Sequence, residues 1–344
     1  MSKTTMTARM RVGILAVGTA VLVGIGSCSV PVPEFTPPPQ DAEVYPVLDE
    51  ERLDEVLAEV NETLTKADEE SDRDELSPRI DGRAKQMRGW EYALAKAMKK
   101  ADADEPYTPQ PLSTDPAVYV IAATEEWPRN VMVITDPPDE GNAPMLLTLV
   151  QETPRDQYTL RGWVRLAPGV TTPQVNAAVT GSKQVSDDAD GLILSPEQTI
   201  EAYAEWLNKG KKAKHAKKFA KDQYKEIIDS ELKGLKESLD VAGKVTQTTK
   251  PAGSVTAIET FDGGVIVFGG LRSQQVYEKT VDDAKMRVGT MVAAKNGGDA
   301  NVDTKLTAVY DHMIAFYVPP EDSEEKISLL GAERVLSSVK EPEE

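Results

Sequence analysis

Apolar residues between positions 53 and 64 recur at the spacing of an α-helix. Five aliphatic side chains fall on one stripe, and acidic residues stand between them. The stripe consists of Leu53, Val56, Leu57, Val60 and Leu64. A second helix start is predicted at Ser77-Pro78, because serine is a favoured N-cap and proline a favoured first helical residue. The pattern therefore predicts a folded body that begins near Leu48 with two helices.

Short strand-like runs replace the helical pattern from residue 117 onward. They are rich in apolar and β-branched residues, and the segments between them have the Pro, Gly, Asp and Asn residues of turns. The four runs are "AVYVIAATE", "RNVMVITD", "PMLLTLVQE" and "YTLRGWVRLAP". Strands that follow one another without helices between them indicate an antiparallel sheet.

The same order of elements returns after residue 191. Ser195 precedes Pro196, and Gln198 stands three residues after the serine, which predicts a capping box at the start of a helix. A further amphipathic helix is predicted from Tyr224 to Leu239. Four more strand-like runs follow, namely "SVTAIETF", "GGVIVFGGLRSQQVYEK", "KMRVGTMVAA" and "KLTAVYDHMIAFYVPP".

This repetition predicts an α+β fold with an internal duplication. We expect two tandem units, each with helices on a curved antiparallel sheet, at residues 48–170 and 192–320. Residues 171–191 would form a linker between the units, and residues 321–344 an acidic C-terminal segment.

The first 27 residues have the features of an export signal. Three basic residues precede an uncharged apolar run of 14 residues from Val12 to Ile25. A membrane-spanning helix needs roughly 20 apolar residues, so the run is short for a permanent span. Residues 1–27 are therefore predicted to be a cleaved signal peptide.

The residues before the only cysteine, Ile25-Gly26-Ser27-Cys28, resemble the lipobox of bacterial lipoproteins. The resemblance implies that diacylglycerol is attached to the Cys28 thiol and that the peptide is cut just before it. Cys28 would then anchor the protein to the outer face of the cytoplasmic membrane. The alternative is an ordinary secretory signal with an incidental cysteine, but a leftover free thiol is uncommon in an exported protein, which favours lipidation.

Residues 28–47 are predicted to form a tether, because six prolines stand between Ser29 and Val47 with little apolar periodicity. Removal of residues 1–27 takes three of the 39 basic residues and none of the 57 acidic ones, so the mature chain would have a net charge of −21. This charge argues against affinity for nucleic acid or anionic lipid. No second cysteine is available for a disulfide or a cysteine-based metal site.

The lipobox, the proline-rich tether and the order of elements together resemble actinobacterial surface lipoproteins of uncharacterised function. These proteins contain tandem cystatin-like or nuclear transport factor-like units, in which helices cover one face of a curved antiparallel sheet. The resemblance implies a cone-shaped fold for each unit, and it implies no catalytic residue or cofactor.

Residues 186–197 approach the pattern of a calcium-binding loop. Asp188, Asp190 and Glu197 stand at positions three, five and twelve, and Gly191 stands at position six. Position one is Ser186 instead of aspartate, and Ser195 and Pro196 already explain a capped helix start. We therefore interpret the segment as a polar linker, with a calcium site as the alternative.

Seven lysines lie between Lys209 and Lys221 in an otherwise acidic protein. The run is explained by a solvated helix or helix connection. The alternative is a patch that meets anionic headgroups, acidic polymers or a partner protein in the cell envelope. The candidate patch residues are Lys211, Lys214, Lys218 and Lys221.

The sequence contains few residues and no motifs that are typical of catalytic sites. Its two histidines are His215, within the lysine run, and His312, which we interpret as a residue on the face of a strand. No nucleophile elbow, phosphate-binding loop or histidine pair is present in the sequence. We therefore expect a non-catalytic binding or scaffold protein of the cell envelope, without a cofactor. A carrier of an apolar or lipid-like ligand in a cone cavity is the alternative, and an envelope hydrolase has the least support.

Overall fold

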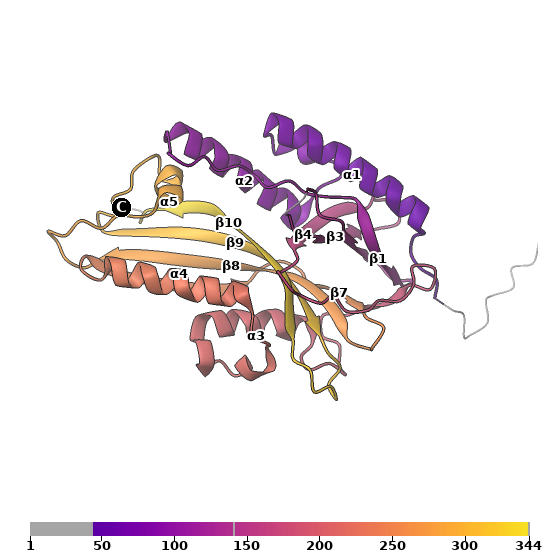
Figure 1. Cartoon of the computed structure of the whole chain (residues 1–344). Helices are drawn as coiled ribbons and strands as arrows, with labels where there is room; N and C mark the ends of the chain where they lie inside the picture. Colours follow the sequence, from indigo (N-terminus) through magenta and orange to yellow (C-terminus); the bar gives the residue numbers. More distant parts are fainter. Residues whose placement is uncertain (1–43, 140–141, 343–344) are drawn as a thin grey trace, which may run out of the picture. The chain divides into compact units, whose positions relative to one another are not determined.

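The computed structural model describes residues 44–139 and 142–342 of the chain (Figure 1). The predicted signal peptide, Cys28 and nearly all of the predicted tether lie outside the described residues. Within the described ranges, none of the helices has both the length and the apolar character that a bilayer span requires.

The chain begins with the two predicted helices, α1 (Glu50–Glu70) and α2 (Gly82–Lys100). Asp49 caps α1, because its side chain accepts a hydrogen bond of 2.8 Å from the Arg52 backbone. The second helix starts later than Ser77-Pro78 predicted, because the backbone before Gly82 is extended and pairs with Leu160. Gly82 has a φ of +58°, which glycine adopts readily and which turns the chain into the helix.

The four strands predicted after α2 are all present and antiparallel. They are β1 (Pro116–Ala123), β2 (Arg129–Thr135), β3 (Met145–Gln151) and β4 (Thr159–Arg165). A short strand that the sequence did not predict, β5 (Ser182–Val185), follows them and pairs parallel with β1.

The second helical region contains α3 (Pro196–Lys209) and α4 (Gln223–Leu239). The predicted capping box at Ser195 is confirmed, since its hydroxyl accepts the Gln198 backbone amide and the Gln198 side chain accepts the Ser195 amide. Between these helices lie two short 3₁₀ turns, η2 (Gly210–Lys212) and η3 (Ala216–Lys218). The lysine run is therefore a helix connection.

The last part of the chain forms long strands. They are β6 (Gly243–Pro251), β7 (Thr256–Glu259), β8 (Val265–Lys279), β9 (Lys305–Val318) and β10 (Ser328–Lys340). The strand predicted for "KMRVGTMVAA" is wrong, because this segment is a loop that ends in the short helix α5 (Thr290–Lys295). The sequence did not predict β6 or β10, and β10 lies within the predicted acidic C-terminal segment.

All ten strands belong to one sheet, with the order β10-β9-β8-β7-β5-β1-β2-β3-β4 and β6 paired with β8. β5 joins the two halves, because it pairs parallel with β1 and antiparallel with β7. The far ends of the sheet also meet. Leu166, just after β4, forms a bridge with Gly331 of β10, and the Ala167 amide donates to the Leu330 carbonyl over 2.8 Å. The sheet is therefore nearly closed, like a barrel.

The main hydrophobic core contains side chains from both halves of the chain. Trp163 and Met132 come from the first half, and Phe268 and Met313 come from the second. A Cβ atom on Gly162 would lie 2.1 Å from the Phe268 ring, so glycine is required where β4 faces β8. The fold is a mixed α+β architecture, but two separate cystatin-like units are not confirmed, because sheet and core are shared.

Candidate functional site

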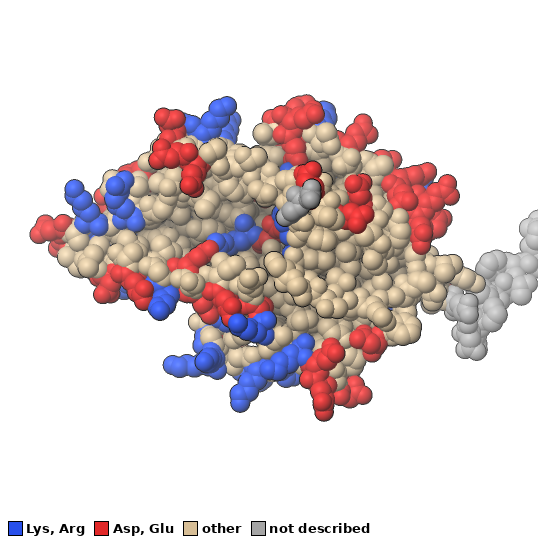
Figure 2. Space-filling view, viewed as in Figure 1, with Lys and Arg blue, Asp and Glu red and all other residues tan. Residues whose placement is uncertain are grey.

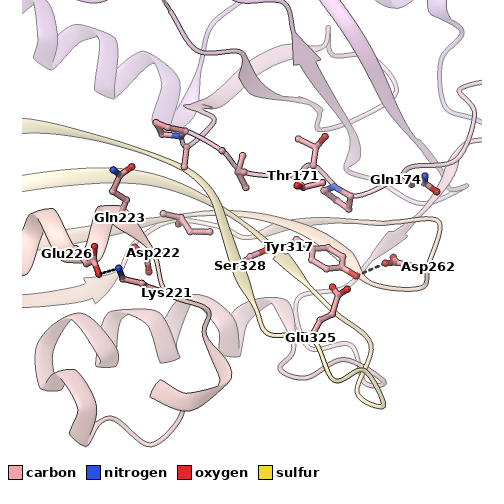
Figure 3. A pocket seen from close by; sticks show the side chains of 17 residues that line it. Thr171, Gln174, Lys221, Asp222, Gln223, Glu226, Asp262, Tyr317, Glu325 and Ser328 are labelled. Carbon is pink, nitrogen blue, oxygen red and sulfur yellow. Dashed lines mark hydrogen bonds and ion pairs between the residues drawn. The ribbon is translucent and has the colours of Figure 1, made fainter.

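A polar pocket lies beside the place where β4 meets β10 (Figure 3). Its volume is about 790 Å³. Four segments line it, namely the loop 167–174 after β4, the start of α4, the turn between β7 and β8, and the connection from β9 to β10. The closure of the sheet positions the pocket, because it brings the loop after β4 next to the start of β10.

Tyr317 and Asp262 form one wall of this polar pocket. The Tyr317 hydroxyl donates a hydrogen bond of 2.6 Å to Asp262, as Figure 3 shows. The other carboxylate oxygen of Asp262 accepts the Thr260 hydroxyl and the Gly264 amide. Burial alone would raise the pKa of Asp262, but these hydrogen bonds lower its pKa below the ordinary value. Burial and the contact with Asp262 raise the pKa of Tyr317, so its phenol remains protonated at neutral pH.

The start of α4 forms the opposite wall. Asp222 caps this helix, because its side chain accepts a hydrogen bond of 2.6 Å from the Lys225 backbone amide. The same side chain accepts a hydrogen bond of 3.1 Å from the Tyr203 hydroxyl of α3. Burial raises the pKa of Asp222 despite these donors. Lys221 forms an ion pair of 3.1 Å with Glu226 at the rim.

The ionisable side chains of the pocket are mostly acidic. Four carboxylates and one ammonium group line it. The carboxylates belong to Asp222, Glu226, Asp262 and Glu325, and the ammonium group belongs to Lys221. Thr171, Gln174 and Ser328 add neutral hydrogen-bonding groups. This lining favours a ligand that carries positive charge and hydrogen-bond donors, because it offers many acceptors and few donors.

The structure brings one of the four candidate lysines into this pocket, namely Lys221. The Lys218 ammonium donates to the Ile193 carbonyl over 2.7 Å, which joins the helix connection to the segment just before α3. Lys211 and Lys214 are exposed. Figure 2 shows basic side chains gathered over the connection between α3 and α4, at the lower edge of the view.

The calcium-like segment shows no clustering of ligands. Asp188, Asp190 and Glu197 are all exposed, and the Glu197 backbone amide donates to the Asp187 carbonyl at the start of α3. Across residues 44–139 and 142–342, no three His, Cys, Asp or Glu residues are grouped so that they could hold a metal ion. The geometry therefore gives the calcium alternative no support.

His312 lies on the face of β9 that α4 covers, and it is completely buried. Its Nδ1 atom contacts the Tyr224 hydroxyl of α4. Burial, reinforced by the charges of Arg334 and Arg83, lowers the pKa of His312 to about 3. The imidazole is therefore neutral at physiological pH and stands away from the polar pocket, in agreement with its interpretation as a residue on a sheet face.

Sequence reasoning missed the pocket residues Asp262, Tyr317 and Glu325. A signal was present at Asp262, because Asp-Gly is a turn dipeptide and the Asp262 side chain stabilises the turn that ends at Gly264. Tyr317 and Glu325 gave no comparable signal. They belong to the pocket because β9 and β10 pair with each other and place the connection between them beside the loop 167–174.

A comparison with protein families adds one finding. The family model described as Domain of unknown function (DUF8094) matches residues 44–339. The chain belongs to this family. No curated protein and no solved structure matches the chain significantly. The DUF8094 match spans both units predicted from the sequence, so the family domain coincides with the shared sheet instead of one half of it.

Proposed function

We propose that this DUF8094 protein is an exported lipoprotein, anchored through Cys28, whose folded part binds a ligand or partner in the cell envelope without chemical conversion. The lipobox-like residues Ile25 to Cys28 support the anchor, and the proline-rich residues that follow support a tether. The anchor would hold the protein at the outer face of the cytoplasmic membrane, where soluble envelope components reach it.

The observation that carries the binding function is the composition of the polar pocket. Its acidic groups are held by fixed partners, since Asp262 accepts from Tyr317 and Asp222 accepts from Tyr203. A positioned set of acceptors around a cavity of about 790 Å³ suits a ligand that bears amino groups, such as a basic peptide segment. A histidine is not among the lining residues, so the pocket does not offer a Ser-His or Cys-His pair for nucleophilic catalysis.

Binding is tested by calorimetric titration of the full-length protein with a tri-lysine peptide. We expect saturable binding that Glu325→Gln weakens about threefold to tenfold, because one lining carboxylate is lost. Glu324→Gln is the matched control, since Glu324 is exposed on the same connection and does not line the pocket. Equal binding by both variants, or equal binding of a tri-glutamate peptide, would contradict the proposal.

The anchor is tested by Cys28→Ala. We expect the wild-type protein to partition into detergent and the variant to remain in the aqueous phase or as uncut precursor, because lipidation requires the thiol. Membrane retention of a fully processed Cys28→Ala protein would remove the support for the lipoprotein assignment.

A second candidate function, carriage of an apolar ligand, is favoured by a groove outside the sheet. This groove has a volume of about 600 Å³ and runs between α4 and α5, lined by Leu235, Tyr277 and Tyr310 among others. Ile227 and Met291 at its edges are each 49% exposed. A cavity inside the curved sheet has less support, because buried side chains such as Trp163 and Phe268 fill that space. Binding of palmitate that Met291→Lys abolishes would favour the carrier.

A further inference from the structure

A second cavity, which we call the arginine cavity, lies below the start of α2. Its volume is about 490 Å³. It is bounded by α2, by β2, β3 and β4, by β8, and by the loop between β6 and β7. Figure 1 shows α2 running from β4 toward α5, so its first turn lies at the seam between the two halves of the sheet. Three arginines line the cavity, namely Arg83, Arg161 and Arg272.

Arg83 is a buried cation with incomplete partners. Its side chain is 14% exposed, and its closest carboxylate is Asp311 at 3.5 Å. Arg272 already holds the same oxygen of Asp311 at 2.8 Å. The remaining contacts of Arg83 are to the carbonyls of Ala252 at 2.5 Å and His312 at 3.5 Å. One buried carboxylate therefore serves two guanidinium groups, and Arg83 is the less compensated of the two.

The backbone around Arg83 is shaped to admit its guanidinium. A Cβ atom on Gly270 of β8 would lie 2.4 Å from the Arg83 Nε atom, and one on Gly253 would lie 3.0 Å from its Nη2 atom. Glycine at these two positions lets the strand and the loop lie against the planar group. Burial lowers the pKa of Arg83 in spite of Asp311, and the nearby charge of Arg272 adds to this effect. Burial of this cation at the cavity therefore lowers the free energy of unfolding of the protein.

A buried hydroxyl among the lining residues also lacks a partner. Thr148 of β3 lines the arginine cavity and is completely buried. Its Oγ1 atom has no hydrogen-bond partner among the residues that the structure describes. An unpaired buried hydroxyl is costly, so its presence at a cavity wall indicates a group that completes its hydrogen bonding.

Arg161 and the first turn of α2 supply further donors. Arg161 of β4 is 27% exposed and forms ion pairs with Glu152, which also lines the cavity, at 2.8 Å and with Asp81 at 3.7 Å. Gly82 and Arg83 begin a helix of 19 residues, whose N-cap Asp81 makes no side-chain capping bond. The free backbone amides and positive dipole of such a helix start favour an anion.

We propose that the arginine cavity binds a phosphate group. The donors come from α2, β3, β4 and β8 and therefore surround the cavity from several directions. This arrangement suits the oxygens of a tetrahedral oxyanion better than the flat face of a carboxylate. A bound phosphate would compensate Arg83 and accept a hydrogen bond from Thr148. The inference goes beyond the proposed function, because it concerns a different cavity and a ligand of opposite charge.

The direct test is calorimetric titration of the full-length protein with inorganic phosphate at constant ionic strength. We expect saturable uptake of one phosphate per chain and a higher melting temperature in phosphate than in chloride. Arg161→Gln should weaken the affinity at least about tenfold, because a charged hydrogen-bond donor is lost. Arg155→Gln is the matched control, since Arg155 belongs to the same β3–β4 hairpin and does not line the cavity.

Thr148→Val separates a ligand role from a structural one. If the hydroxyl has no ligand, its removal leaves phosphate affinity unchanged and maintains or raises stability, because a buried unpartnered group is lost. The proposal predicts instead an affinity at least about threefold weaker with the melting temperature in chloride maintained. Wild-type phosphate affinity in both Arg161→Gln and Thr148→Val would overturn it.

The phosphate has two potential sources, namely a soluble molecule or a lipid headgroup. Inorganic phosphate tests the first source, and co-sedimentation of the unlipidated Cys28→Ala protein with phosphatidylglycerol vesicles tests the second. Uptake in either arm that depends on Arg161 supports the proposal and identifies the source. Failure of both arms would overturn it, and would leave peptide binding by the polar pocket as a separate result.

Discussion

The polar pocket and the arginine cavity both lie where the two halves of the sheet meet, but their charges are handled differently. In the polar pocket Asp262 accepts three hydrogen bonds from its own neighbours. In the arginine cavity Arg83 shares one carboxylate with Arg272, and Thr148 has no partner within the described residues. Asp262 is therefore satisfied without a ligand, whereas Arg83 and Thr148 would gain partners from one. Unsatisfied buried groups therefore discriminate between the sites better than cavity size.

The largest expected effect concerns the carboxylate that the arginines share. Asp311→Asn should lower the free energy of unfolding by about 3 kcal/mol, because buried Arg83 loses its only carboxylate partner within the described residues. Arg272 adds little to this loss, since its side chain is 47% exposed and water can solvate it. Asp262→Asn should cost less than about 1 kcal/mol, since Asp262 is exposed to solvent. Urea unfolding measures both values. Equal losses of stability in the two variants would contradict the difference in burial between Asp311 and Asp262.

A smaller effect is expected from filling the slot beside Arg83. Gly270→Ala should destabilise the protein by about 1–3 kcal/mol, because the new methyl group would overlap the Arg83 side chain and the Ala252 carbonyl. It should also weaken phosphate binding, since Arg83 must move.

Gly234→Ala is the matched control for this substitution. Gly234 lies within α4, and a Cβ atom there meets nothing within 4 Å. Alanine should therefore stabilise the helix by about 0.5–1 kcal/mol. A Gly270→Ala protein as stable as the Gly234→Ala protein would contradict the close approach of Arg83.

The smallest effect is the dependence of stability on pH at the polar pocket. Because the folded-state pKa of Asp262 is depressed, its contribution is present above the ordinary value of 3.8 and is lost as the pH falls through the folded-state value. The stability difference between wild type and Asp262→Asn should therefore be constant from pH 7 to about 5 and should decline as the pH falls below 3.8.

Asp222 should behave with the opposite sign. Burial raises its folded-state pKa, so protonation favours the folded protein, and this effect grows as the pH falls toward its ordinary value of 3.8. Urea unfolding of wild type, Asp262→Asn and Asp222→Asn across this pH range measures both signs. The same sign for the two aspartates would contradict the hydrogen bonding assigned to Asp262.

The sequence predicted the elements better than their assembly. Ser195 was identified as an N-cap because its signal is local, and the strands β1 to β4 were identified because turn residues separate them. β6 was missed because its sequence, "GKVTQTTKP", is largely polar. The pairing of β5 with both β1 and β7 has no local signal, and it converts two predicted units into one sheet.

The candidate sites were harder to predict for the same reason. Arg83, Arg161 and Arg272 are far apart in the sequence, and only the closed sheet brings them together. The glycine pair in "FGG" of β8 has no local signal for its role, because that role depends on the close approach of Arg83 to Gly270. The seven lysines from Lys209 to Lys221 predicted a patch because they are close together in the sequence, but only Lys221 lines the polar pocket.

The most direct test of two separate binding sites is a crossed titration. Wild type, Arg161→Gln and Glu325→Gln are each titrated with inorganic phosphate and with the tri-lysine peptide. We predict that Arg161→Gln loses phosphate affinity and retains peptide affinity, and that Glu325→Gln does the reverse, because each residue lines one cavity only. If either variant loses both ligands equally, or neither variant loses any, the assignment of opposite ligands to the two cavities is wrong.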